Sequence, residues 1–262
     1  MFPLVPEELG ADFDLEKALR FGTIPLIWRA DDPRPTLEAY VQLYLREEVK
    51  AEALVRNLPG FVRFLPIAGL FHGQTVNVSA IARDSGTART TVAGYLEILE
   101  DTLLAWRLPA FEARLRVRER KHPKLYWTDP GLARAVKRQL GPPTAEERGS
   151  LFEGWILTVL RAYAEERRLY DEIFYWAPAQ SRQTEVDFVL RRDDEVLAIE
   201  IKSKRRFTRD LLSGLLAIGD LDGLVRRVLV YEGTQELVTQ EGIEVWPVRR
   251  FLDALAAAEM WP

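Results

Sequence analysis

The sequence predicts a protein of mixed α/β (α+β) class, with helices in its first part and a sheet in its last. Two patterns predict this class. Apolar residues near the N-terminus recur at the three- and four-residue spacing of amphipathic helices, whereas the C-terminal part alternates helix-like and strand-like stretches. With 262 residues and a 47% hydrophobic fraction, the chain is long and apolar enough to bury a core.

The composition excludes several kinds of chemistry. The chain has no Cys, which excludes disulfides, thiolate metal sites and cysteine nucleophiles, and two His are too few for a histidine metal cluster. A net charge of -4 argues against a polycation that coats nucleic acid, although a local basic patch is compatible with it. The start of the chain lacks the pattern of a signal peptide, and no stretch suits a membrane span. We therefore expect a cytoplasmic protein without membrane association.

Residues 1–72 predict a helical, lid-like segment. Asp14 is placed to cap a helix that begins at Leu15. Farther along, apolar residues again follow helical spacing, at Leu37, Val41, Tyr44, Leu45 and Val49.

Residues 73–140 predict a winged helix-turn-helix. The stretch from Val78 to Gly86 indicates a short helix ended by glycine, and Thr87 is placed to cap a longer helix after it. Extended stretches at 103–108 and 124–128 then enclose a run of basic residues. Helix, turn, helix and basic hairpin is the order of this DNA-binding architecture.

Candidate DNA contacts lie on the second of these helices, on the hairpin and after a later strand. The run from Arg114 to Lys124 holds six basic side chains and one acidic side chain, a charge that phosphates attract. Acidic residues farther along the second helix, such as Glu97, favour the alternative of a packing or partner-binding winged helix with a solvated hairpin. The predicted nucleic-acid contacts are Arg89, Thr90, Arg116, Arg118, Arg120, Lys121, Lys204, Arg205 and Arg206.

Residues 146–255 predict an α/β domain, which follows the linker-like Gly141-Pro142-Pro143. The expected order is a helix, three strands, a helix, two strands and a last helix. The expected elements are the helix 146–168, strands 173–176, 185–191 and 196–202, the helix 208–217, strands 227–231 and 243–248, and a helix from Arg249.

Two carboxylates meet in a predicted hairpin of this domain. If Asp193-Asp194 form a two-residue turn, Asp187 lies opposite Glu200 and Glu185 opposite Lys202. Opposed carboxylates repel unless a cation or a proton lies between them, and Mg²⁺ or Mn²⁺ takes such oxygen ligands. Lys202 would then stabilise phosphoryl charge in phosphodiester hydrolysis. The alternative is a cross-strand Glu185–Lys202 ion pair without metal.

This hairpin resembles the core of the PD-(D/E)XK nucleases: Asp187 is followed across the turn by Glu200-Ile201-Lys202. Glu153, on the helix before it, resembles the additional acid of that superfamily, whereas Val186 stands where the superfamily has proline. The resemblance implies a metal-dependent endonuclease with Mg²⁺ or Mn²⁺. It implies Glu153, Asp187 and Glu200 as metal ligands and Asp187, Glu200 and Lys202 as catalytic residues.

A second resemblance covers nearly the whole chain. Its motifs are similar to the C-terminal region, a domain of unknown function, of prokaryotic AAA+ ATPases: 44–49, 95–101, 121–126, 152–154 and 185–189. The chain has no Gly-Lys dipeptide and hence no P-loop, so we expect no ATPase activity from this chain alone. Besides DNA, the expected partners are an ATPase or a second copy of the chain. The alternative function is a non-catalytic DNA- or protein-binding module that keeps an inactive nuclease fold.

Overall fold

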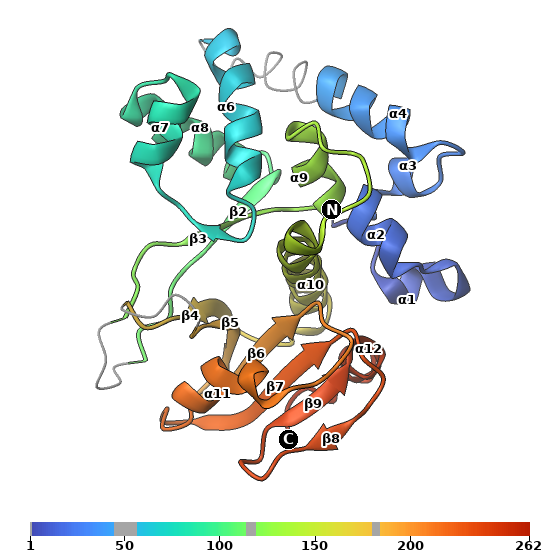
Figure 1. Ribbon diagram of the computed structural model, residues 1–262, viewed down its shortest axis with the longest axis vertical. Helices are drawn as coiled ribbons and strands as arrows, with labels where there is room; N and C mark the ends of the chain where they lie inside the picture. Colours follow the sequence, from blue (N-terminus) through green and yellow to red (C-terminus); the bar gives the residue numbers. More distant parts are fainter. Residues whose placement is uncertain (1, 45–56, 114–118, 180–183) are drawn as a thin grey trace. The chain divides into compact units, whose positions relative to one another are not determined.

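The structure is a computed structural model that describes residues 2–44, 57–113, 119–179 and 184–262 (Figure 1). Its mixed helices and sheets confirm the predicted α+β class. The chain forms two compact units, the first from Met1–Arg107 and Lys124–Thr158 and the second from Leu108–Pro123 and Val159–Pro262. The division falls inside the helix α10 (Ala145–Arg167). Among the described helices, none is long and apolar enough to cross a bilayer.

The first unit begins with short helices, as its apolar spacing predicts. Asp14 caps α2, because its side chain accepts a hydrogen bond from the Lys17 N–H at 3.0 Å. The predicted positions Leu45 and Val49 lie outside the described residues. The elements are α1 (Pro6–Leu9), η1 (Gly10–Asp12), α2 (Leu15–Phe21), α3 (Pro25–Trp28), α4 (Pro33–Ala39), the π-helical turn η2 (Tyr40–Tyr44) and α6 (Leu58–Leu70).

The same unit contains the two helices and the two later strands that the sequence predicts for residues 73–140, in that order. Gly86 ends α7 with a φ of 62°, which confirms the predicted stop. The capping position of α8 is Ala88, so the prediction of Thr87 was wrong: the Thr87 hydroxyl donates to the Ser85 carbonyl instead. The elements are α6, β1 (Gln74–Thr75), α7 (Val78–Ser85), α8 (Arg89–Asp101), β2 (Ala105–Leu108) and β3 (Lys124–Trp127), with sheet order β1-β3-β2, followed by α9 (Pro130–Val136).

Residues on either side of the basic run between β2 and β3 pair with β4 and the residues after it. Arg116 and Arg118 lie outside the described residues, but the segments on either side of them belong to the second unit. There Ala110 and Glu119 form bridges with β4 and the residues after it, and the Arg120 N–H donates to the Ala177 carbonyl at 2.9 Å. These segments cover a sheet edge, which would otherwise expose unpaired backbone groups.

The second unit is built on a six-stranded sheet of order β4-β5-β6-β7-β9-β8 (Figure 1). The strands β4, β5 and β6 are antiparallel, whereas β6, β7 and β9 run parallel. Every predicted strand is present, and β8 is an addition. The elements are β4 (Glu172–Trp176), β5 (Val186–Arg192), β6 (Glu195–Lys202), η3 (Arg209–Leu212), α11 (Ser213–Ala217), β7 (Leu224–Tyr231), β8 (Leu237–Val238), β9 (Glu244–Pro247) and α12 (Val248–Ala256).

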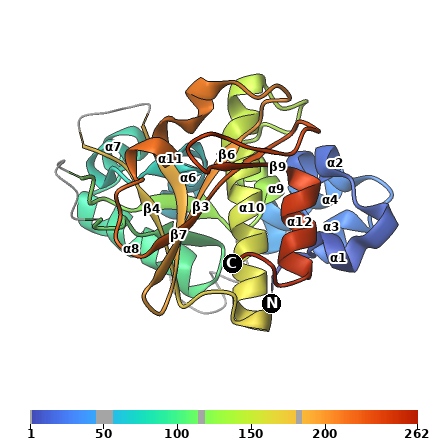
Figure 2. The same ribbon diagram turned by 90° about the horizontal axis from the view of Figure 1, so that it is seen from below.

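Helices cover this sheet and seal its core. Val189, Val196 and Ala198 join Leu211 and Leu215 in one buried apolar cluster, so η3 and α11 pack on the face that these strand residues share. Figure 2 shows α12 beside the C-terminal half of α10, where Arg167 donates a hydrogen bond to the Ala256 carbonyl. Burial on both faces explains why the central residues of each strand, 188–190 of β5 and 196–199 of β6, are all apolar.

The hairpin of β5 and β6 has the predicted register. Arg192 pairs with Glu195 across the Asp193-Asp194 turn, and the pairing runs to Phe188 opposite Ile199. Asp193 has a φ of 52°, the left-handed conformation that a two-residue hairpin turn needs. Asp187 and Glu200 are the next positions on the two strands.

Candidate acidic site and nucleic-acid contacts

Asp187 is buried where the β5–β6 pairing ends. Asp187 is only 3% exposed, and its Oδ2 accepts a hydrogen bond from the Ile201 N–H at 2.8 Å. This bond joins the carboxylate to the backbone of the neighbouring strand. This bond holds Asp187 beside β6, where its charge acts on Glu200.

Glu200 is also buried, at 2% exposed, and its negative charge is only partly compensated. Its Oε1 forms an ion pair with the Lys202 ammonium, but its Oε2 has no hydrogen-bond partner. Burial, and then the charge of Asp187, raise the pKa of Glu200 well above its ordinary value, although Lys202 opposes this. A buried carboxylate oxygen without a partner is unfavourable unless a cation or a proton meets it.

Gly214 of α11 allows the close approach that buries these acids. A Cβ at this position would lie 1.7 Å from the Glu185 carbonyl oxygen and 3.2 Å from Glu200 Oε2. Any side chain there would push α11 away from the strands. Sequence reasoning missed this residue, because nothing in the local pattern tells a glycine of close approach from a glycine of flexibility.

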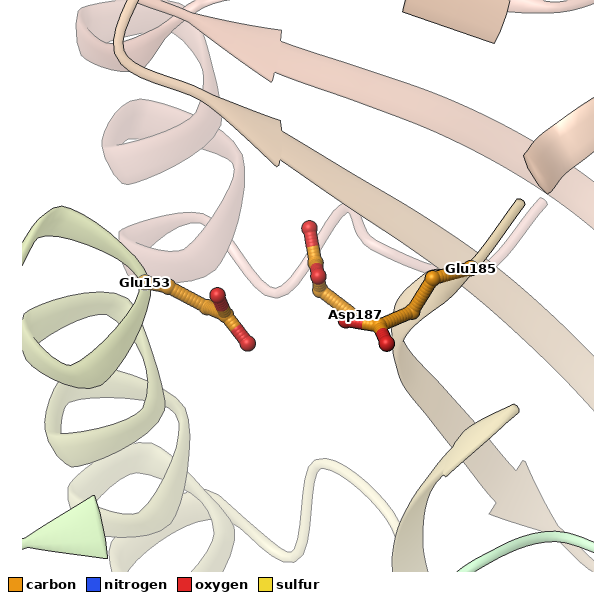
Figure 3. Close-up of side chains that lie close together, drawn as sticks. All are labelled: Glu153, Glu185 and Asp187. Atoms are coloured by element: carbon orange, nitrogen blue, oxygen red, sulfur yellow. The ribbon is translucent and has the colours of Figure 1, made fainter. Parts of the chain in front are cut away.

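Glu185 is a third acid of the second unit, just before β5. One of its carboxylate oxygens lies within 4.8 Å of one from Asp187, and Figure 3 shows both side chains. Its ion pair is with Arg120, at 3.6 Å between Nη1 and Oε2. The sequence predicted Glu185 opposite Lys202 and missed Arg120, because the two partners are far apart in the chain.

Glu153 belongs to the first unit, where its charge is compensated. Lys124 Nζ lies 2.9 Å from Glu153 Oε1, and the Tyr126 hydroxyl donates to the same oxygen. The Lys124 side chain is only 3% exposed, so this is a largely buried ion pair. Such a pair holds the carboxylate in one orientation.

The predicted nucleic-acid contacts fall into separate groups. Arg89 and Thr90 are exposed on the first turn of α8 in the first unit. In the second unit, Lys121 is exposed and forms an ion pair with Glu112 at 3.7 Å. Arg120 is half-buried and forms an ion pair with Glu185. A further basic group is exposed just after β6, at Lys204, Arg205 and Arg206.

Comparison with known protein families gives two matches, which together cover most of the chain. A family model described as a domain of unknown function (DUF8612) matches residues 12–142, half of the chain, and the chain belongs to this family. A second model, also a domain of unknown function (DUF4143), matches residues 148–251. That domain is commonly the C-terminal region of AAA-type ATPases, which agrees with the resemblance seen in the sequence.

Two curated relatives are the uncharacterized proteins Rv2008c of Mycobacterium tuberculosis and Mb2031c of Mycobacterium bovis. Each is 28% identical over 195 residues, which cover 72% of this chain and 42% of the relative. The chain thus spans less than half the length of the curated relatives it matches. Among solved structures, protein VC1899 from Vibrio cholerae matches with a TM-score of 0.33 and 17% identity, over 86% of this chain and 55% of that one.

Proposed function

We propose that this chain is a DNA-binding protein whose second unit is a metal-dependent endonuclease-like domain, a phosphodiester hydrolase. One observation carries the proposal: Asp187 and Glu200 are buried on adjacent strands, and Glu200 Oε2 has no partner. Two neighbouring buried carboxylates would repel, so they suit the binding of a hard divalent cation.

The donor set fits Mg²⁺ or Mn²⁺, because carboxylate oxygens are the ligands that these ions prefer. In this proposal Asp187 and Glu200 hold the ion, and Glu153 assists from α10 as the nuclease resemblance implies. The bound ion would supply a Lewis acid and lower the pKa of a ligating water. Lys202, whose side chain is 32% exposed, would move its ammonium from Glu200 to the phosphoryl oxygens.

DNA contacts complete the proposal. The exposed Arg89 and Thr90 at the start of α8 occupy the position from which a helix-turn-helix contacts DNA. Lys204, Arg205 and Arg206 follow β6 directly and would bind phosphates near the acids. The match to a region common in AAA-type ATPases makes an ATPase the proposed protein partner, with self-association as the other choice.

A plasmid-nicking assay with Mg²⁺ and Mn²⁺ tests the catalytic proposal. We expect metal-dependent nicking by the wild type and its loss in Asp187→Asn and Glu200→Gln. Lys202→Ala should also lose nicking yet bind metal at least as tightly, because an ammonium beside the site opposes a cation. Equal nicking by the wild type and Asp187→Asn would show contamination and refute the proposal.

The second candidate function is a non-catalytic module that binds DNA or a protein. The direct ion pair between Lys202 and Glu200 favours it, because the lysine already neutralises part of the acid charge. In that case Mn²⁺ leaves the melting temperature unchanged and DNA binding persists without cleavage.

A further inference from the structure

The first unit contains a cavity that the proposed function does not use. Its volume is about 440 Å³, which lies within the range of sites that bind small molecules. The residues that line it belong to α4, η2, α6, α9 and the turn after α9, all in the first unit. Figure 1 shows α9 between α4 and α6, and α9 contacts both helices. The cavity is therefore large enough for a small organic ligand and is built within one unit.

Part of the lining is apolar and belongs to the core. Leu65, Val136 and Leu140 line the cavity, and all three are also buried members of the hydrophobic core of this unit. Val62 and Pro66 of α6 add half-buried apolar surface to the lining. These side chains offer no hydrogen bonds, so a ligand gains free energy from them by burying apolar surface of its own. The lining thus favours a ligand with an apolar body.

The charged residues of the lining leave one positive charge without a counter-ion. Arg34 and Glu38 of α4 form an ion pair at 3.2 Å between Nε and Oε1, so their charges balance. Arg138 also lines the cavity, is exposed, and forms no ion pair within the part of the chain that the structure describes. A guanidinium beside apolar side chains favours a ligand that carries a negative charge.

Arg138 stands where the backbone favours glycine. It follows α9 with a φ of 59°, and its N–H donates to the Ala135 carbonyl at 3.0 Å. This left-handed conformation at the end of a helix suits glycine, because a Cβ makes it less favourable. Stability alone therefore does not explain an arginine at this position. A use of its side chain does, and residues with such backbone strain cluster at ligand sites.

Two walls of the cavity depart from regular α-helix. Val41 and Gln42 line it from the π-helical turn η2, and π-helical turns occur frequently at functional sites. In α6, Pro66 has no N–H to donate to the Val62 carbonyl, so the helical hydrogen bonds are interrupted beside the cavity. Both irregularities fall on residues that line the cavity, which supports a binding role for it.

We propose that this cavity binds a small organic carboxylate. The apolar body of the ligand packs on Leu65, Val136 and Leu140, and its carboxylate pairs with Arg138, whose planar fork matches the two oxygens. The single uncompensated positive charge suits a carboxylate better than a phosphate monoester, which carries about two negative charges at neutral pH. This site lies in the first unit and does not depend on the metal site of the proposed function.

Calorimetric titration with octanoate and with the neutral alcohol of the same length, octanol, tests the proposal. The wild type should bind octanoate about fivefold more tightly than octanol, because only the carboxylate pairs with Arg138. Arg138→Gln should bind the two ligands equally. Arg138→Gly should also lose the preference, yet raise the melting temperature by about 2 °C, because glycine relieves the strained backbone.

Two further variants locate the ligand. Val62→Trp places an indole in the cavity and should weaken both ligands at least about tenfold. Arg63→Gln is the matched control, because Arg63 is an exposed arginine of α6 that does not line the cavity, and it should keep the fivefold preference. If Val62→Trp does not fold, Gln42→Trp from the exposed lining of η2 replaces it.

Three outcomes would overturn the proposal. The first is equal affinity of the wild type for octanoate and octanol, or no binding of octanoate at millimolar concentration. The second is a preference for octanoate that survives Arg138→Gln. The third is unchanged affinity for both ligands in a folded tryptophan variant, which would place them elsewhere. None of these titrations contains metal or DNA, so their result is independent of the proposed nuclease activity.

Discussion

Asp129 of the first unit and Glu200 of the second are both buried acids, and they differ in how their oxygens are used. Asp129 Oδ2 accepts the Thr23 N–H at 2.7 Å and its Oδ1 accepts the Leu132 N–H at 3.2 Å, so it caps α9 and ties it to an earlier loop. Glu200 meets one lysine, and its second oxygen meets no donor.

Both acids have raised pKa values, so the pKa alone does not tell structure from function. Burial raises the pKa of Asp129 to about 6, against the opposing effect of its backbone donors. Burial and the charge of Asp187 raise that of Glu200. What differs is satisfaction by hydrogen bonds: the satisfied acid stabilises the fold, and the unsatisfied acid is available to a ligand.

The largest expected effect is a loss of stability when Asp129 is replaced, and it tests the contrast between the two acids. Asp129→Ala removes a helix cap and leaves two buried N–H groups unpaired, so we expect a loss of about 3 kcal/mol in the free energy of unfolding. Glu200→Gln should be neutral or slightly stabilising without metal, because it removes a repulsion from Asp187. Urea denaturation of both variants measures the contrast. A comparable loss in Glu200→Gln would make Glu200 a structural residue and contradict the distinction.

Mn²⁺ should stabilise the folded state through the second unit, and Asp129 should not contribute to this stabilisation. At Mn²⁺ concentrations of about 100 times the dissociation constant, binding adds about 2.7 kcal/mol to the free energy of unfolding. Glu200→Gln should abolish this gain, whereas Glu172→Gln, an exposed acid of β4, should keep it. A thermal-shift series with and without Mn²⁺ gives the comparison. A wild-type melting temperature that does not respond to millimolar Mn²⁺ or Mg²⁺ would rule out the site.

His72 is a third buried titratable group, and its pKa is shifted in the opposite direction, downward. Its Nδ1 accepts the Trp127 N–H at 3.1 Å, and burial, followed by the charge of Lys137, lowers the pKa of His72 to about 3. Because the folded-state pKa lies below the unfolded value, the unfolded chain binds the proton more tightly, and stability falls as the pH drops below about 6.5. His72→Gln removes this titration but keeps an acceptor for Trp127.

The free energy of unfolding of the wild type should therefore fall by about 2 kcal/mol relative to His72→Gln between pH 7 and pH 5. Urea titrations of the two proteins at both pH values measure the difference, in which the titration of Asp129 cancels. Parallel pH dependence of the two proteins would mean that His72 is protonated within the fold. That result would remove it from the set of structural groups.

The sequence predicted the hairpin but not its surroundings, for a physical reason. Alternation and the Asp193-Asp194 turn fix the register locally, and the pairing from Arg192 opposite Glu195 to Phe188 opposite Ile199 follows it as predicted. The ion pair of Arg120 with Glu185 depends on tertiary pairing: the segments beside β4 satisfy an open sheet edge, which no local pattern in the basic run indicates. The shift of the α8 cap from Thr87 to Ala88 has a smaller cause, local competition for a hydroxyl hydrogen bond.

The smallest expected effects are on DNA affinity, and they compare exposed basic residues of the two units. Arg89 stands exposed at the start of α8, whereas Lys204, Arg205 and Arg206 stand exposed after β6. If Arg89 reads a groove or a phosphate, Arg89→Gln should weaken DNA binding by about 1 kcal/mol, and Lys204→Gln should do the same if phosphates run past the acids. Each lost phosphate contact lowers the slope of log affinity against log salt by about 1.

Fluorescence anisotropy at several salt concentrations measures both quantities, with Arg34→Gln of the exposed Arg34–Glu38 pair as control. A changed slope in Arg89→Gln alone assigns DNA binding to the first unit. A changed slope in Lys204→Gln alone assigns it to the second unit, where it would bring the phosphate backbone to Asp187 and Glu200. Unchanged slopes in both variants would contradict the proposed DNA contacts and favour a protein as the partner of these surfaces.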